Sequence, residues 1–124
     1  MIGYSTIGVN DLDRAVGFYS ELLAELGATQ LFGNERIKFF GTGTDAAMLA
    51  VCIPYDEQAQ HRGNGNMIAI SAGDRPNVDK LYAKALSLGA TDEGEPGERN
   101  PAFYGAYVRD LDGNKLCFYE MNLG

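Results

Sequence analysis

Apolar residues recur at helical spacing in two stretches of the chain. Between residues 10 and 27 the charged side chains fall between apolar positions, which are Leu12, Ala15, Val16, Tyr19, Leu22, Leu23 and Leu26. Between residues 74 and 89 the same spacing joins Val78, Leu81, Tyr82, Ala85 and Leu88. We therefore predict amphipathic helices near 11–26 and 75–88, each with its apolar face against a sheet.

Residues that favour helix ends flank both stretches. Asn10 or Asp11 can cap the first helix, and Asp74 or Asn77 can cap the second, because their side-chain oxygens accept bonds from unpaired N–H groups. Each helix then ends at a residue that tolerates a left-handed backbone, Gly27 or Gly89.

The segments around the two helices repeat. "LGAT" occurs at 26–29 and at 88–91, and "YSTIGVND" at 4–11 is similar to "MIAISAGD" at 67–74. Three strand-like segments follow each helix: about 29–33, 35–41 and 46–53 in the first half, and about 91–95, 103–109 and 114–121 in the second. The order βαβββ therefore occurs twice.

This repeat predicts the fold class. We expect one α+β domain over residues 1–124, with module one at 1–56, a linker at 57–63 and module two at 64–124. A helix covers only one face of its sheet, so two modules packed edge to edge leave their other faces around a shared cleft. The prediction is a curved eight-stranded mixed sheet around that cleft, with the helices outside.

The closing hairpin, "YGAYVRDLDGNKLCFYE" at 104–120, has two distinct faces. Asp112-Gly113-Asn114 predicts a tight turn between its strands. One side-chain parity is apolar and suits a core: Ala106, Val108, Leu116 and Phe118. The other parity mixes polar groups with a thiol and phenols and is expected to face the cleft: Tyr107, Arg109, Lys115, Cys117 and Tyr119.

The segment 92–101 is expected to be a charged loop at the cleft rim, where Arg99 and Asn100 are solvent-exposed or meet a ligand.

Composition narrows the classes of partner. The formal net charge of −7 disfavours nucleic acids and anionic membrane surfaces, which both require basic surfaces. Two cysteines without a Cys-x-x-Cys pair predict free thiols and a cytoplasmic location. The N-terminal residues are not expected to act as a signal peptide, and the longest apolar run, 46–53, is too short to span a bilayer.

Taken together, these motifs resemble the vicinal oxygen chelate superfamily, which includes glyoxalase I, bleomycin-resistance proteins and extradiol dioxygenases. The similar segments are "IGVNDLDRAVGFYSELLAELGA", "GNGNMIAISA" and "AFYGAYVRDLDGNKLCFYE". The resemblance implies three metal-ligand positions, which fall on Tyr4, Met67 and Cys117. The enzymes usually place histidine, histidine or glutamine, and glutamate there.

The residues at these three positions make a poor ligand set. Phenol, thioether and a single thiol do not suit the divalent metals of such enzymes, so we expect no metal or other cofactor. Glu120 lies on the opposite strand parity from Cys117, so it could replace the missing carboxylate only if a bulge shifted the register by one residue. His61, the only histidine, falls in the linker, where it is either an ordinary surface residue or an acid or base at the cleft mouth.

Two functions remain open from the sequence. The first is a homodimeric binding protein for a small apolar or aromatic molecule, held by cleft residues Tyr4, Phe39, Met67, Tyr104, Tyr107, Cys117 and Tyr119. The second is a metal-dependent lyase, isomerase or dioxygenase of the glyoxalase type, whose ligands lie at unidentified positions. The sequence favours the first. It leaves open whether modules pair within one chain or between chains.

Overall fold

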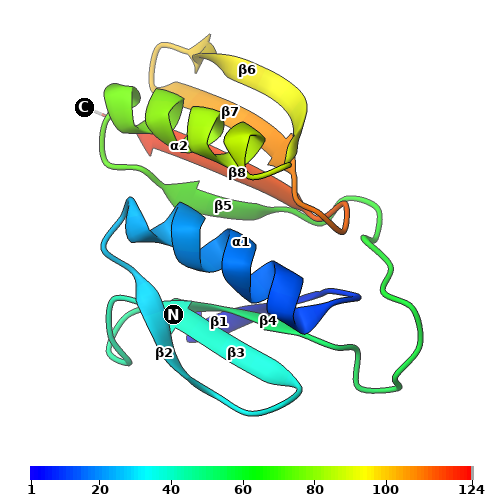
Figure 1. Cartoon of the computed structure of the whole chain (residues 1–124). Helices are drawn as coiled ribbons and strands as arrows, with labels where there is room; N and C mark the ends of the chain where they lie inside the picture. Colours follow the sequence, from blue (N-terminus) through cyan, green and yellow to red (C-terminus); the bar gives the residue numbers. More distant parts are fainter. Residues whose placement is uncertain (124) are drawn as a thin grey trace. The chain divides into compact units, whose positions relative to one another are not determined.

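The computed structural model describes residues 1–123. The chain divides into two compact units, Met1–His61 and Arg62–Gly124, and each is described by itself. Each unit contains one helix and four strands in the order βαβββ (Figure 1). The predicted α+β class, with tandem βαβββ modules, is therefore confirmed.

Unit 1 is a four-stranded mixed sheet with one helix. Its elements are β1 (Tyr4–Gly8), α1 (Leu12–Ala24), β2 (Thr29–Gly33), β3 (Ile37–Gly41) and β4 (Met48–Cys52). The strand order is β1-β4-β3-β2, in which β1 runs parallel to β4 and the other pairs are antiparallel.

Unit 2 repeats this arrangement. Its elements are β5 (Ile68–Ser71), α2 (Arg75–Ser87), β6 (Thr91–Asn100), β7 (Phe103–Arg109) and β8 (Lys115–Met121). The strand order is β5-β8-β7-β6, with β5 parallel to β8. The eight predicted strands are thus hydrogen-bonded as four and four, because the first strand of each module pairs with the last strand of the same module.

The two units also share the hydrogen bonds at the ends of their helices. Asp11 and Asp74 are the N-caps, and their side chains accept bonds from Arg14 N and Asn77 N. Asn10 has another partner, because its Oδ1 accepts a bond from Gln60 N at 2.9 Å. Both helices end in equivalent turns: Ala28 N donates to Leu23 O at 3.1 Å, and Ala90 N donates to Ala85 O at 3.0 Å. Left-handed glycines close both turns, Gly27 with φ 73° and Gly89 with φ 105°.

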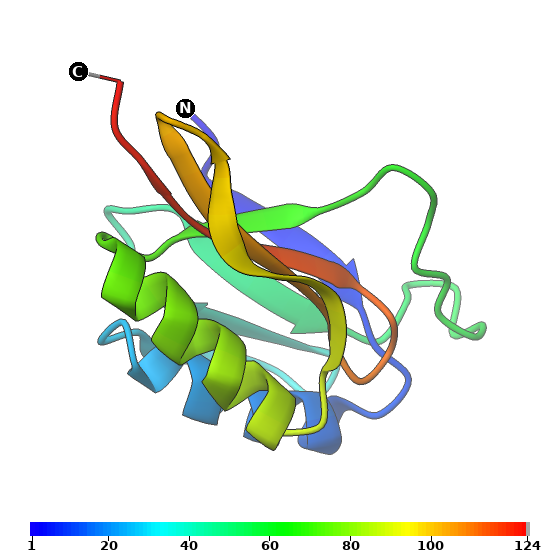
Figure 2. The same ribbon diagram turned by 90° about the horizontal axis from the view of Figure 1, so that it is seen from above.

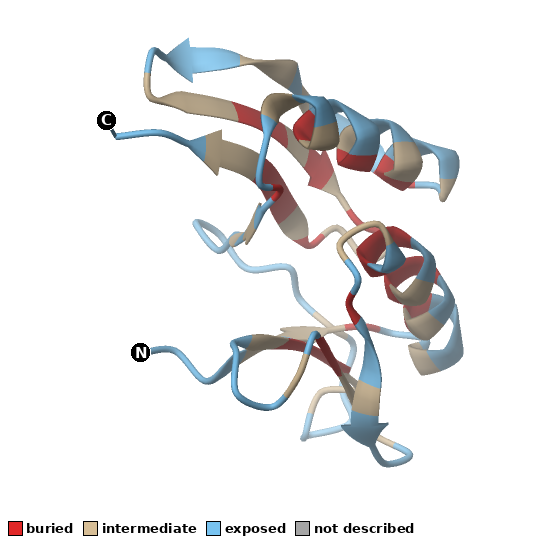
Figure 3. Cartoon of the chain, turned by 90° about the vertical axis from the view of Figure 1, so that its left-hand side faces the viewer, coloured by how far each residue is buried: buried red, intermediate tan, exposed pale blue. Residues whose placement is uncertain are grey.

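Each helix buries its apolar stripe against its own sheet. Leu22 is 0% exposed and Leu81 is 1% exposed, so both predicted helix faces are confirmed. In unit 1 the helix packs on the side of the sheet that carries Phe40 and Val51. In unit 2 the buried parts of α2 lie over buried parts of β7 and β8 (Figure 3). None of the helices among residues 1–123 is long and apolar enough to cross a membrane.

Strand β6 is longer than the sequence predicted. The segment 92–101 was expected to be a loop, yet pairing with β7 continues to Asn100 through three register shifts. These shifts absorb the extra residues and bend the strand, as Figure 2 shows. Because β6 is an edge strand, Pro96 is tolerated there without costing an interior ladder bond.

Candidate functional site

The predicted turn of the closing hairpin, together with the preceding Asp110, forms a hydrogen-bonded structure of its own. Asp110 Oδ1 accepts bonds from the backbone N–H groups of Asp112 and Asn114, both at 2.9 Å. Its other oxygen accepts a bond from Asn114 Nδ2 at 3.1 Å. Asp110 and Asn114 are each 6% exposed, so these bonds are made in a largely dry turn. This turn therefore fixes the register of β7 against β8.

That register separates the two faces of the closing hairpin as predicted. Tyr107 pairs with Cys117, and Val108 pairs with Leu116. The apolar parity is fully buried on the side of α2, at Ala106, Val108, Leu116 and Phe118. We call the opposite side of the β5–β8 sheet the open face of unit 2. Tyr107, Cys117 and Tyr119 lie on it.

Cys117 and Tyr107 form a neutral pair at the centre of this face. Cys117 is 0% exposed, and burial raises its pKa, although Tyr107, Arg99 and Lys115 each act in the opposite direction. Burial also raises the pKa of the Tyr107 hydroxyl, and the neighbouring Cys117 adds to this shift. Both groups are therefore protonated at neutral pH. A thiol in this state is a poor nucleophile, so the geometry gives Cys117 no activated chemistry.

Two cations flank the ring of Tyr107. Arg99 Cζ lies 5.4 Å from the ring centroid and Lys115 Nζ lies 5.3 Å from it. Arg99 is further held by a 2.6 Å bond from its Nη2 to the carbonyl oxygen of Glu95. Sequence analysis placed Lys115 on this face by strand parity, but the position of Arg99 depends on the register shifts of β6.

Glycines in β6 and β7 make room for these side chains. A Cβ on Gly94 would lie 3.0 Å from Tyr107 Cδ2, and one on Gly97 would lie 2.9 Å from Arg99 Nη1. On β7, the ring of Phe103 folds over Gly105 and stacks on Tyr119, with 5.5 Å between centroids and 4° between planes. Phe103 is a part of this face that the sequence analysis did not name.

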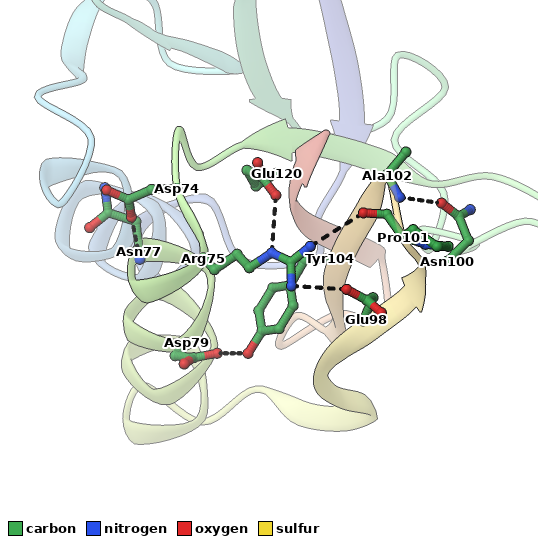
Figure 4. A network of polar contacts seen from close by, with 10 residues as sticks. All are labelled: Asp74, Arg75, Asn77, Asp79, Glu98, Asn100, Pro101, Ala102, Tyr104 and Glu120. Atoms are coloured by element: carbon green, nitrogen blue, oxygen red, sulfur yellow. Dashed lines mark hydrogen bonds and ion pairs between the residues drawn. The ribbon is translucent and has the colours of Figure 1, made fainter. Parts of the chain in front are cut away.

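Tyr104 does not belong to the open face, although the sequence analysis included it among the cleft residues. Its hydroxyl donates to Asp79 Oδ1 at 2.6 Å, and Arg75 Cζ lies 5.0 Å from its ring centroid (Figure 4). Arg75 also bonds Glu98 and Glu120 at 3.1 and 3.4 Å. Tyr104 shares the strand parity of Ala106 and therefore points to the side of α2, where it ties the helix to the sheet.

Unit 1 has an open face of different composition on the side of its sheet opposite α1. Tyr4 meets Phe39 edge to face at 5.0 Å, and Phe32 stacks on Phe39 at 4.5 Å. Tyr4 is 55% exposed and Phe32 is 46% exposed. Tyr4 and Phe39 were predicted ligand contacts. Phe32 was missed, although its position in the predicted strand 29–33 could have indicated it.

Comparisons with known proteins identify the family. A sequence profile of the Glyoxalase/Bleomycin resistance protein/Dioxygenase superfamily matches residues 1–118. The chain belongs to this superfamily. A crystal structure of a glyoxalase/bleomycin resistance protein from Albidiferax ferrireducens is 31% identical, with a TM-score of 0.90 over 98% of this chain and 99% of that chain.

More distant superfamily structures share the fold. Lactoylglutathione lyase from Agrobacterium tumefaciens is 22% identical, with a TM-score of 0.71 over 97% of this chain and 92% of its own. Glyoxalase I from Zea mays is 24% identical, with a TM-score of 0.73 over 96% of this chain and 44% of its own. Curated protein sequences gave no significant match.

The three positions that the resemblance assigned to metal ligands carry side chains that do not suit a divalent metal: a phenol at Tyr4, a thioether at Met67 and a thiol at Cys117. Met67 is 43% exposed just before β5, and Cys117 is a buried thiol kept protonated, whereas a metal ligand must be a thiolate. Within residues 1–123, no three His, Cys, Asp or Glu side chains gather as a metal site. His61 is exposed where the two units join in sequence.

Proposed function

We propose that this glyoxalase-superfamily protein binds a small aromatic molecule and does not perform metal-dependent catalysis. The observation that carries the proposal is the aromatic character of the open face of unit 2, where Phe103 stacks on Tyr119 and Tyr107 pairs with a thiol that is buried and protonated. Tyrosine and phenylalanine offer flat apolar area with little loss of side-chain freedom, which suits a flat ligand. On the open face of unit 2 the proposed contacts are Met67, Tyr107, Tyr119 and Phe103, beside the buried Cys117. On unit 1, Tyr4, Phe39 and Phe32 form an aromatic surface of their own.

Affinity for such a ligand would come mainly from apolar contact. Each Å² of apolar area removed from water contributes roughly 25 cal/mol before the costs of association. A polarizable sulfur atom adapts to ring edges, which gives the exposed Met67 a binding role that needs no ionisation. The enzymes among the structural neighbours are under 25% identical, so their activities do not transfer to this chain.

The test is a ligand titration of wild type and two tyrosine variants. Tyr107→Ala removes the central ring of the open face of unit 2, and we expect it to weaken an aromatic ligand about tenfold. Tyr55→Ala is the matched control, because Tyr55 is 88% exposed and belongs to neither open face. Ligands that copurify with the protein are first identified by mass spectrometry. Calorimetry with these ligands then measures the affinity of each variant. Equal affinities in the two variants would contradict the proposal, as would one bound Ni²⁺ or Zn²⁺ per chain with turnover of an aldehyde substrate.

We also propose a homodimer in the cytoplasm. Strand β1 is an edge strand whose sequence, YSTIG, contains neither proline nor charge to block pairing with another chain. Both cysteines are free thiols, as a reducing compartment requires. Light scattering at micromolar concentration should give twice the mass of one chain, and the mass of a single chain would contradict the dimer.

A further inference from the structure

The charged side chains on the two sides of the sheet in unit 2 differ in how completely they are paired. On the side of α2, the carboxylates of Asp79, Glu98 and Glu120 bond Tyr104 or Arg75. On the open face, Arg109 is paired with Glu93 at 2.8 Å. The remaining cations there, Arg99 and Lys115, have no carboxylate partner among the described residues.

The side chain that both cations contact is a phenol. Arg99 Cζ and Lys115 Nζ lie 5.4 and 5.3 Å from the centroid of the Tyr107 ring, and the hydroxyl group of Tyr107 is a further hydrogen-bond donor. A patch of donors and positive charge on a chain of net charge −7 is complementary to a negatively charged group and repels a cationic one.

The patch is also held in place before any ligand arrives. Arg99 is exposed, but its bond to the Glu95 carbonyl and its contact with Tyr107 restrict its side chain, and Gly94 and Gly97 leave the space in which it lies. Lys115 rests over the same ring and is half-buried. Cations positioned in this way lose less freedom on binding than extended surface side chains do.

We infer that the open face of unit 2 recognises an organic carboxylate, with the carboxylate group beside the cations Arg99 and Lys115 and the apolar part of the ligand along Tyr107, Tyr119 and Phe103. The inference rests on the proposed function and narrows it from aromatic molecules to aromatic acids. A guanidinium binds a carboxylate through two parallel N–H donors, and the ammonium group of Lys115 adds a point charge. The stacked Phe103–Tyr119 pair supplies the apolar surface next to it.

The simplest competing explanation is that both cations only cover the Tyr107 ring and are solvated outside it. The two explanations differ in how ligand charge affects affinity. If the cations recognise a carboxylate, removing either one weakens acids and leaves neutral analogues unaffected. If they only cover the ring, acids and neutral analogues respond alike.

The experiment compares 1-naphthoate with 1-naphthamide, which has nearly the same shape and no charge, by isothermal titration calorimetry. We expect wild type to bind the acid more tightly. Arg99→Gln and Lys115→Gln should each weaken the acid about tenfold and change the amide less than about twofold, because a hydrogen bond to a charged group is worth more than one to a neutral group. Arg14→Gln, which removes one positive charge from exposed α1, controls for net charge. Arg99→Lys should recover part of the loss.

Each outcome decides a different point. Equal binding of acid and amide to wild type, or an acid affinity unchanged in both glutamine variants, overturns the carboxylate inference and leaves aromatic binding intact. Failure of both compounds to bind wild type at millimolar concentration overturns the proposed aromatic function together with the inference. If Arg14→Gln weakens acid binding as much as Arg99→Gln and Lys115→Gln do, the effect comes from net charge alone, and the inference is overturned.

Discussion

The two units use the same framework but present different open faces. Their N-caps, left-handed glycines and helix-end hydrogen bonds correspond one to one. On the open face of unit 1, Tyr4, Phe39 and Phe32 contact one another. On that of unit 2, Tyr107 is flanked by Arg99 and Lys115. The interactions that stabilise the repeat are therefore separate from the groups proposed to bind a ligand, which occupy the side of each sheet away from its helix.

The largest expected effect tests the shared framework. Leu22 in α1 and Leu81 in α2 are almost fully buried, and replacing either with alanine should lower the free energy of unfolding by about 2–5 kcal/mol. Urea denaturation followed by circular dichroism measures both. Ala24→Ser, on the exposed side of α1, is the control. Similar losses in the two units support equivalent frameworks, and a negligible loss in one of them breaks the comparison.

Much of this framework was predictable because it depends on local rules. Helical spacing located both helices, and strand parity placed Glu120 with Phe118, where it bonds Arg75 of α2. The same parity already contained the information that Tyr104 points to the side of Ala106. Tyr104 was predicted as a ligand contact from its residue type, without regard to its position in the strand.

Other parts of the site depend on features that local rules do not reveal. Gly94, Pro96 and Gly97 indicate a loop by composition, yet β6 continues through them because its bulges absorb the irregular residues. Those same bulges set the face on which Arg99 lies. The pairing of strands fixes Lys115 beside Tyr107, but only the three-dimensional structure brings both cations to one ring.

The second-largest expected effect is a loss of stability in unit 2, at the turn between β7 and β8. Asp110→Ala removes the acceptor of three hydrogen bonds in the turn, those from Asp112 N, Asn114 N and Asn114 Nδ2. We expect a loss of about 2 kcal/mol in the free energy of unfolding. Asp110→Asn retains one carbonyl oxygen for the two backbone donors, so thermal melting should show a smaller loss. Equal losses in the two variants would mean that the carboxylate charge matters more than acceptor geometry.

The smallest effect compares the two cysteines, which lie on equivalent last strands, β4 and β8. Burial raises the pKa of Cys117 above its ordinary value of 9.0, so the folded protein holds that proton more tightly than the unfolded chain does. The stabilising contribution of Cys117 is complete below the unfolded pKa and is lost as pH rises through the folded value. Unfolding free energies measured from pH 8 upward should therefore fall less steeply for Cys117→Ala than for wild type, and Cys52→Ala serves as the matched control.

At pH 7, iodoacetamide should modify the half-buried Cys52 before Cys117, because Cys117 is both inaccessible and protonated. Rapid alkylation of Cys117 at this pH would show that its thiol is activated, and the open face of unit 2 would then have to be regarded as a reactive centre instead of a binding surface.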